Sequence, residues 1–220
     1  MLERKVFIMI QSLSRALAFA GATLFAASHA HAELSAVELA KIAQNPVGAM
    51  VSVPFQNNTN LNYGPLQGTQ NVLNIQPVIP VSVNSEWNII TRTILPVVSL
   101  PSLAVGDDRV NGLGDIQLSA MLSPAVPGNW IWGAGAITQA PTHTNDALGN
   151  NHWGLGPQVV ALHMAKGDPW VYGALVSNIW SVGGASSPSY NNGLIQYFVN
   201  YNFPGGVYLT TSPINTVNWK

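Results

Sequence analysis

Apolar and polar side chains alternate with a period of two residues along several stretches of this chain. The clearest stretch is Leu194–Phe203, in which every second residue from Ile195 onward is aliphatic or aromatic. Val72–Val83 has the same pattern, with Asn74, Gln76 and Ser82 opposite its apolar positions. Because successive side chains of a β-strand point to opposite faces, this period predicts strands with one apolar and one polar face.

The chain is predicted to be almost entirely β. The nine predicted strands are Gly48–Gln56, Val72–Val83, Trp87–Val98, Gly114–Ser123, Trp130–Pro141, Leu155–Met164, Trp170–Trp180, Leu194–Phe203 and Val207–Asn218. Most are longer than the average strand of a soluble domain, which has about 5–6 residues, and match the about 9–11 residues of a tilted membrane strand. A soluble β-propeller fits less well, because each blade needs four short strands. Prolines within the predicted strands, which forfeit ladder hydrogen bonds, either argue against the barrel or mark bulges.

A short polar turn followed by an aromatic residue occurs four times. The aromatics are Trp87, Trp130, Trp170 and Tyr208, which are 43, 40 and 38 residues apart. Longer Gly/Asn-rich connections alternate with these turns, at about residues 57–71, 99–113, 142–154 and 181–193. Short turns on one side, long loops on the other and aromatics at a fixed height are typical of an antiparallel transmembrane β-barrel. We therefore expect these four residues to form the periplasmic membrane girdle.

Charged residues are scarce: 17 of the 220 residues are Lys, Arg, Asp or Glu, whereas charged residues make up about 25% of a soluble domain. Ile42–Ser85 and Pro169–Trp219 contain none. A charge facing lipid costs about 2–4 kcal/mol near the membrane midplane, so a lipid-facing surface explains the deficit. The chain has no Cys, which excludes disulfides and thiolate metal sites. It has no basic stripe either, which argues against nucleic acid as a partner.

The N-terminal region is predicted to direct export. Basic residues precede a short apolar stretch, and Ala30-His31-Ala32 has the small-x-small form of a cleavage site, so residues 1–32 are interpreted as a signal peptide. Residues 33–46 are expected to form a short periplasmic helix, because Ser35 and Glu38 have the spacing of a capping box. Residues 47–220 then form the barrel in the bacterial outer membrane.

Five stretches carry a resemblance to a known family: Pro54–Asn60, Leu73–Pro80, Asn88–Thr93, Gly112–Ile116 and Phe198–Asn202. Together they resemble the bacterial family labelled MetA-pathway of phenol degradation, whose members are often misnamed neuromedin U. The similarity spans nearly all of residues 36–220. The resemblance implies an outer-membrane, transporter-like barrel associated with uptake of aromatic or other hydrophobic compounds.

The resemblance also bears on the number of strands. It implies about twelve strands, whereas about nine are predicted here, and a closed bacterial barrel has an even number. An open edge would leave unpaired backbone groups in lipid. Either Gly48–Gln56 is not a membrane strand, or the chain lacks the C-terminal strands of its relatives; the resemblance favours the second interpretation.

Polar side chains on the predicted strands are expected to line the interior. These lumen-facing candidates are Gln76, Arg92, Asp115, Gln117, Gln139, Gln196 and Asn200. Arg92 and Asp115 are among the few charges within strands, and such charges face the interior and usually pair. They serve either a solute path or a structural network. The residues His143, Asp146 and His152 of one loop are interpreted as solvated rather than as a hydrolase or metal site.

The sequence thus predicts an outer-membrane β-barrel that acts as a passive channel or transporter for small molecules, which the resemblance suggests are aromatic or hydrophobic. The alternative is a non-conducting barrel with a structural or adhesive role. The expected partners are outer-membrane lipid and a small-molecule solute. We expect no catalytic residues, no enzyme activity, no metal and no cofactor.

Overall fold

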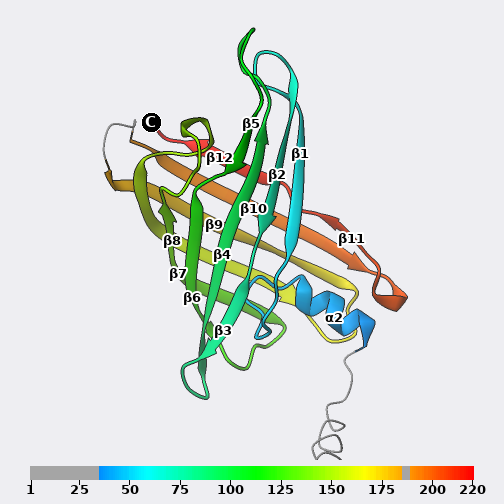
Figure 1. The fold of residues 1–220 in the computed structure, drawn as a ribbon. Coiled ribbons are helices and arrows are strands. Elements are labelled where there is room, and N and C mark those ends of the chain that lie inside the picture. Colours follow the sequence, from blue (N-terminus) through cyan, green and yellow to red (C-terminus); the bar gives the residue numbers. More distant parts are fainter. Residues whose placement is uncertain (1–34, 185–188) are drawn as a thin grey trace, which may run out of the picture. The chain divides into compact units, whose positions relative to one another are not determined.

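A computed structural model describes residues 35–184 and 189–220 of the chain; the predicted signal peptide lies outside these residues. Within the described residues, twelve strands follow one short helix (Figure 1). The elements are α2 (Ala36–Ala43), β1 (Phe55–Tyr63), β2 (Gly68–Ile75), β3 (Val78–Ser82), β4 (Trp87–Leu100), β5 (Val110–Leu113), β6 (Ile116–Pro124), β7 (Trp130–Ala140), β8 (His152–Met164), β9 (Trp170–Gly184), β10 (Asn191–Asn202), β11 (Tyr208–Thr211) and β12 (Ile214–Asn218), with short 3-10 helices η1 (Asp146–Leu148) and η2 (Pro204–Gly206). Within these ranges no helix is both long and apolar enough to span a membrane.

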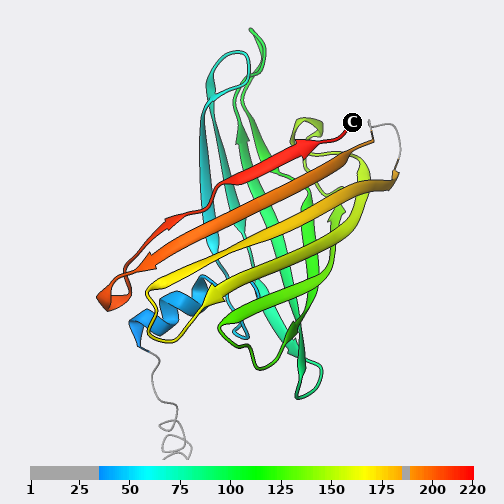
Figure 2. The ribbon, with the colours of Figure 1, turned by 180° about the vertical axis from the view of Figure 1, so that it is seen from behind.

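The strands form one antiparallel sheet in the order β1-β2-β4-β6-β7-β8-β9-β10-β11. The strands β3 and β5 also pair with β4, and β12 pairs with β10, so the sheet has nine strand positions. It curls on itself as a half-barrel (Figures 1 and 2). Among the described residues, β1 on one side and β11 with β12 on the other pair with only one neighbour. The predicted all-β antiparallel class with a short N-terminal helix is confirmed.

Proline explains two of the breaks in this sheet. Pro77 separates β2 from β3, and Pro213 separates β11 from β12. Proline has no N–H to donate, so each break leaves a gap in an otherwise continuous ladder. Pro157 has a milder effect: β8 continues through it, but the β8–β9 pairing skips from Leu155 to Gln158. The pairing register is the same on both sides of each of these three prolines, so the bulges expected there are wrong. The register shift of the β8–β9 pair lies between Trp153 and Gly154 instead, and Pro96 pairs regularly with Asn74.

The first strand differs from the prediction. The segment Gly48–Gln56 was expected to be a strand followed by a long loop, but β1 begins only at Phe55 and continues to Tyr63. The Asn-rich sequence is typical of a loop, yet its amides bond across the β1–β2 pair: Asn60 Nδ2 donates to Gln70 Oε1 at 2.8 Å. The connection is a four-residue turn at residues 64–67. Its glycine has a positive φ of 69°, which glycine adopts without strain.

The two ends of the sheet are distinct. The turn end carries the four short connections, residues 83–86, 125–129, 165–169 and 203–207. The loop end carries residues 64–67, 101–109 and 141–151, together with the connection from β9 to β10. Residues 99–113 and 142–154 were expected to be loops, but β4, β5 and β8 each include two or more of these residues. The predicted loops are therefore in the right places but too long.

The interior of the sheet is apolar at the turn end. Val47 follows α2 and is buried there together with side chains from the strands around it. The other members of this cluster are Val78, Ile90, Met121, Ile131, Val160, Leu162, Val171, Leu175 and Phe198. Hydrogen bonds hold the helix in place: Lys41 Nζ donates to the carbonyl oxygen of Ala165 at 3.1 Å, and Gln44 Nε2 donates to Asn202 Oδ1 at 2.7 Å. The segment 36–47 thus closes part of the turn end.

Candidate functional site

The inner face of the sheet encloses two cavities. The larger has a volume of about 460 Å³ and extends toward the loop end, and the smaller, of about 310 Å³, lies beside the end of α2. Six of the seven lumen-facing candidates line the larger cavity, namely Gln76, Arg92, Asp115, Gln117, Gln139 and Gln196. Asn200 lines the smaller one. The structure therefore brings the predicted set together around one interior space, and its role in a solute path stays a prediction.

Arg92 lies where the two cavities meet, since it lines both. Its Nη2 donates to Gln76 Oε1, and Gln76 Nε2 donates in turn to Gln56 Oε1 at 2.9 Å. Within residues 35–184 and 189–220 it forms no salt bridge. Arg92 therefore lacks the ion pair that charges within strands were expected to form, and its side chain bonds to the amide of Gln76 instead.

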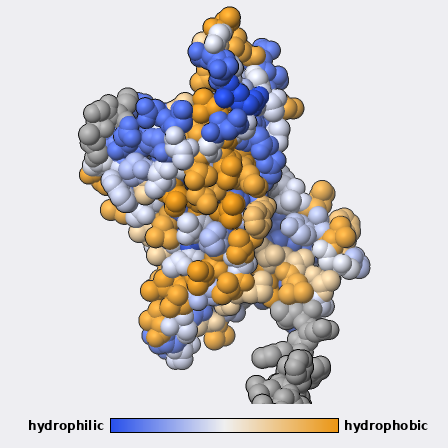
Figure 3. Space-filling model, viewed as in Figure 1, coloured by the Kyte–Doolittle hydropathy of each residue, from blue (hydrophilic) through white to orange (hydrophobic). Residues whose placement is uncertain are grey.

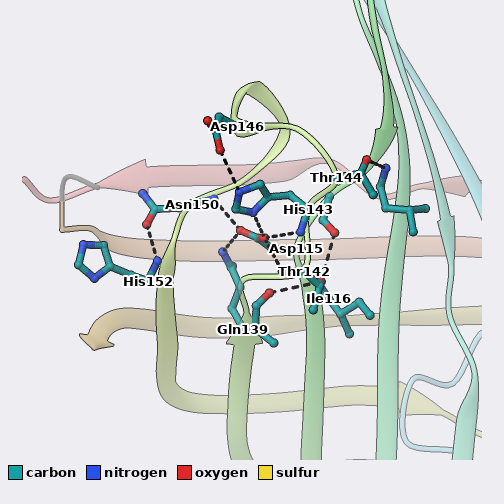
Figure 4. A network of polar contacts seen from close by, with 12 residues as sticks. Asp115, Ile116, Gln139, Thr142, His143, Thr144, Asp146, Asn150 and His152 are labelled. Carbon is teal, nitrogen blue, oxygen red and sulfur yellow. Dashed lines mark hydrogen bonds and ion pairs between the residues drawn. The ribbon is translucent and has the colours of Figure 1, made fainter. Parts of the chain in front are cut away.

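Asp115 instead holds the β7–β8 loop against the wall of the sheet (Figure 4). Its Oδ1 accepts hydrogen bonds from the backbone amides of Thr142, at 3.1 Å, and His143, at 3.2 Å. Its Oδ2 accepts from the backbone amide of Asn150 at 2.8 Å and from Gln139 Nε2 at 3.2 Å. The Nδ1 atom of His143 lies 2.7 Å from Oδ1. This buried carboxylate is fully hydrogen-bonded, as a buried charge must be.

His143 was expected to be solvated, and this is wrong. Its side chain is 6% exposed and that of Asp115 is 5% exposed. Asp146 Oδ1 lies 3.8 Å from the other ring nitrogen and is 97% exposed. The two residues Asp115 and His143 are 28 positions apart, so sequence spacing gave no sign of their contact. Nowhere in the described part of the chain do three His, Asp or Glu side chains come together as a possible metal site.

Tyr190 lies near the same carboxylate, at the end of the β9–β10 connection. It is buried with Ile137 and Ile179. The backbone amide of Ser181 donates to the carbonyl oxygen of Tyr190, and the backbone amide of Tyr190 donates to Ser181 Oγ. Burial and the negative charge of Asp115 raise the pKa of its phenol. Tyr190 is therefore neutral near pH 7, and it extends the apolar part of the interior toward the loop end.

Sequence reasoning missed Gln158, which is 4% exposed and lines the larger cavity. In the sequence, apolar and polar residues alternate poorly along its strand, β8. In the structure β8 alternates regularly between exposed and buried positions, with Gly154, Gly156, Gln158, Val160 and Leu162 all buried. The inner face of this strand is polar only in part, because Val160 and Leu162 pack in the apolar cluster. Burial has a period of two here, whereas hydropathy does not.

The four aromatics predicted to form a girdle begin strands at the turn end. Trp87, Trp130 and Trp170 are the first residues of β4, β7 and β9 and contact other aromatic rings, for example Trp130 with Tyr172 at a centroid distance of 6.0 Å. Tyr208 differs, because it pairs with Asn202 and lines the smaller cavity. Residues directly opposite on paired strands share a face, so Tyr208 faces inward with Asn202. The membrane role of the other three stays a prediction.

One known protein family matches this chain over most of its length. A family model described as "Putative MetA-pathway of phenol degradation" matches residues 53–213. The chain belongs to this family. The match to the phenol-degradation family confirms the resemblance drawn from the sequence, and it includes all seven interior candidates. A search of curated proteins and a search of solved structures found no match.

Proposed function

We propose that this member of the phenol-degradation family is an outer-membrane β-barrel protein that admits small molecules passively through its interior. The observation that carries the proposal is the outer face of the sheet, on which large apolar side chains are exposed, while Gln76, Ser119, Gln158 and Asn200 are buried on the inner face. So extensive an exposed apolar surface is unusual for a soluble protein.

The exposed apolar side chains extend across most of the sheet. They include Leu118 and Leu122 of β6, Trp132 of β7, Val159 of β8, Val176 of β9 and Ile195 of β10. Figure 3 shows apolar side chains over the middle of one face and hydrophilic ones toward the loop end. Monomeric soluble proteins rarely expose an apolar surface beyond a few hundred Å². Lipid around the sheet is the partner that fits such a surface.

The solutes are proposed to be small molecules with aromatic or other apolar parts. Ile94, Ile137, Leu175 and Ile179 line the larger cavity beside its polar residues. Cavities of about 300–1,000 Å³ with mixed linings are typical of sites for small molecules. The volume of about 460 Å³ falls in this range.

A non-conducting barrel is the second candidate, and one observation favours it. The apolar cluster with Val47 and Phe198 fills the interior at the turn end, and α2 is hydrogen-bonded across that end. A solute entering from the loop end would meet this packing before it reached the other side. The two candidates therefore differ in whether the turn end opens.

Liposome swelling distinguishes the two candidates. We expect vesicles containing the purified protein to take up small neutral solutes faster than empty vesicles. The double replacement Val47→Ala and Phe198→Ala should increase the rate further, because it removes side-chain volume from the apolar cluster that fills the interior at the turn end. Val159→Ala, which shortens an exposed outer side chain, serves as the matched control. Vesicles that stay impermeable with both the original protein and the double variant would establish the non-conducting barrel.

A further inference from the structure

We propose that the larger cavity contains a binding site for small aromatic carboxylates, centred on the guanidinium group of Arg92. The inference deepens the proposed function, because it rests on solutes reaching this cavity. It adds a requirement for a negatively charged group on the ligand, which neither the family description nor the exposed apolar surface implies.

The first support is the unbalanced charge of Arg92. A guanidinium group has five N–H donors and stays protonated, yet only one bond, to Gln76 Oε1, is formed among residues 35–184 and 189–220. No carboxylate lies within salt-bridge distance of it in that part of the chain. Buried charges are normally paired, because desolvation without a partner is costly. Arg92 lines both cavities, so an anion has space to bind its remaining donors.

The second support is that Asp115 does not serve as this anion. It is the carboxylate residue that lines the larger cavity, but both of its oxygens are engaged at the loop end. The backbone amides of Thr142, His143 and Asn150 donate to it, as does Gln139. His143 Nδ1 also lies 2.7 Å from its Oδ1, so both carboxylate oxygens are already in contact with groups of the loop end. The positive charge of Arg92 is therefore left for a solute.

The remaining lining defines the rest of the ligand. Apolar side chains, among them Ile137 and Leu175, offer a surface for a ring. Gln158 is 4% exposed, and its Oε1 is buried without a hydrogen-bond partner in the described residues. An unpaired buried acceptor destabilises the protein, and a hydrogen bond from a ligand hydroxyl group would offset this cost. The chemistry that fits is a carboxylate at Arg92, a ring against the apolar wall, and a hydroxyl donor toward Gln158.

Calorimetric titration of the purified full chain in detergent at pH 7 tests this site. The probes are benzoate, 4-hydroxybenzoate and benzyl alcohol, a neutral molecule of similar size. We expect benzoate to bind at least about tenfold more tightly than benzyl alcohol, because charge-assisted hydrogen bonds are the stronger kind. Arg92→Gln should weaken benzoate binding by about tenfold or more and leave benzyl alcohol binding within about twofold. Gln158→Leu should abolish any advantage of 4-hydroxybenzoate over benzoate.

Arg109→Gln is the matched control for the loss of one positive charge. Arg109 bonds to Thr69 and Ser99 on the exposed side of the loop end, so benzoate affinity should not change. Equal affinities for benzoate and benzyl alcohol in the original protein would overturn the proposal, as would full benzoate affinity in Arg92→Gln. If Arg92→Gln does not fold, the affinities of the original protein for benzoate and benzyl alcohol test the proposal without it.

The outcomes also separate this site from the proposed function. If the protein binds benzoate but leaves vesicles impermeable, the proposed passage of solutes is refuted and the proposed binding site is supported. If vesicles swell with neutral solutes but the titration shows no preference for benzoate over benzyl alcohol, the binding site is refuted and the passage of solutes is supported.

Discussion

Replacement of Gly156 by alanine is expected to prevent this protein from folding into its curled sheet. A Cβ atom at this position would lie 1.6 Å from the carbonyl oxygen of Asn178 and 2.7 Å from its carbonyl carbon. Both are backbone atoms of β9, so the contact can be relieved only by separating β8 from β9. Overpacking of side chains alone costs about 1–3 kcal/mol, and a clash with backbone should exceed this. Such a loss is large beside a total stability of about 5–15 kcal/mol.

The measurement is the fraction of refolded protein whose gel mobility changes on boiling. The control is Gly128→Ala, in the turn between β6 and β7, where an added Cβ has no heavy atom within 4 Å. Gly128→Ala should fold like the original protein, and Gly156→Ala should remain unfolded. An equal folded fraction for the two variants would show that β8 and β9 are not as close as described.

Replacement of Asp115 by alanine is expected to release the β7–β8 loop while the strands stay folded. The carboxylate accepts bonds from three loop amides and from Gln139, and it contacts the His143 ring. Each buried donor that is left without its acceptor costs about 1–3 kcal/mol. Digestion with proteinase K within residues 141–151 should therefore accelerate by at least about tenfold, since 1.4 kcal/mol corresponds to tenfold in an equilibrium.

Asp146→Ala is the matched control for this experiment. Asp146 is on the same loop, 3.8 Å from His143 Nε2, but its side chain is 97% exposed. Exposed ion pairs contribute little to stability, so loop digestion should change by less than about twofold. Equal acceleration in both variants would mean that the loop depends on the surface pair instead of the buried carboxylate.

The strand that sequence reasoning located best has a uniformly apolar outer face. Ile195, Tyr197 and Val199 are exposed on that face of β10, and β10 (Asn191–Asn202) contains all of the predicted strand Leu194–Phe203 except its last residue. The turn aromatics located the first residues of β4, β7 and β9. Period and turn chemistry are local properties, so a single sequence contains them.

The errors have a common physical origin in contacts between distant residues. The β1 amides look like loop residues until Gln70 and Asn71 are placed opposite them. His143 appears solvated until the position of Asp115 is known. Tyr208 appears equivalent to Trp170 until its pairing with Asn202 fixes the face that it occupies. In each case the partner determines the environment, and sequence spacing does not reveal the partner.

The docking of α2 has a consequence for the order of folding. Lys41 bonds to Ala165, 124 residues away, and Gln44 bonds to Asn202, 158 residues away. Contacts across such long stretches of chain close large loops at a high entropic cost and form late. We therefore expect the helix to dock only after the hairpins from β7 to β10 are complete. The N-terminal segment is made first, and its docking marks the completion of the sheet.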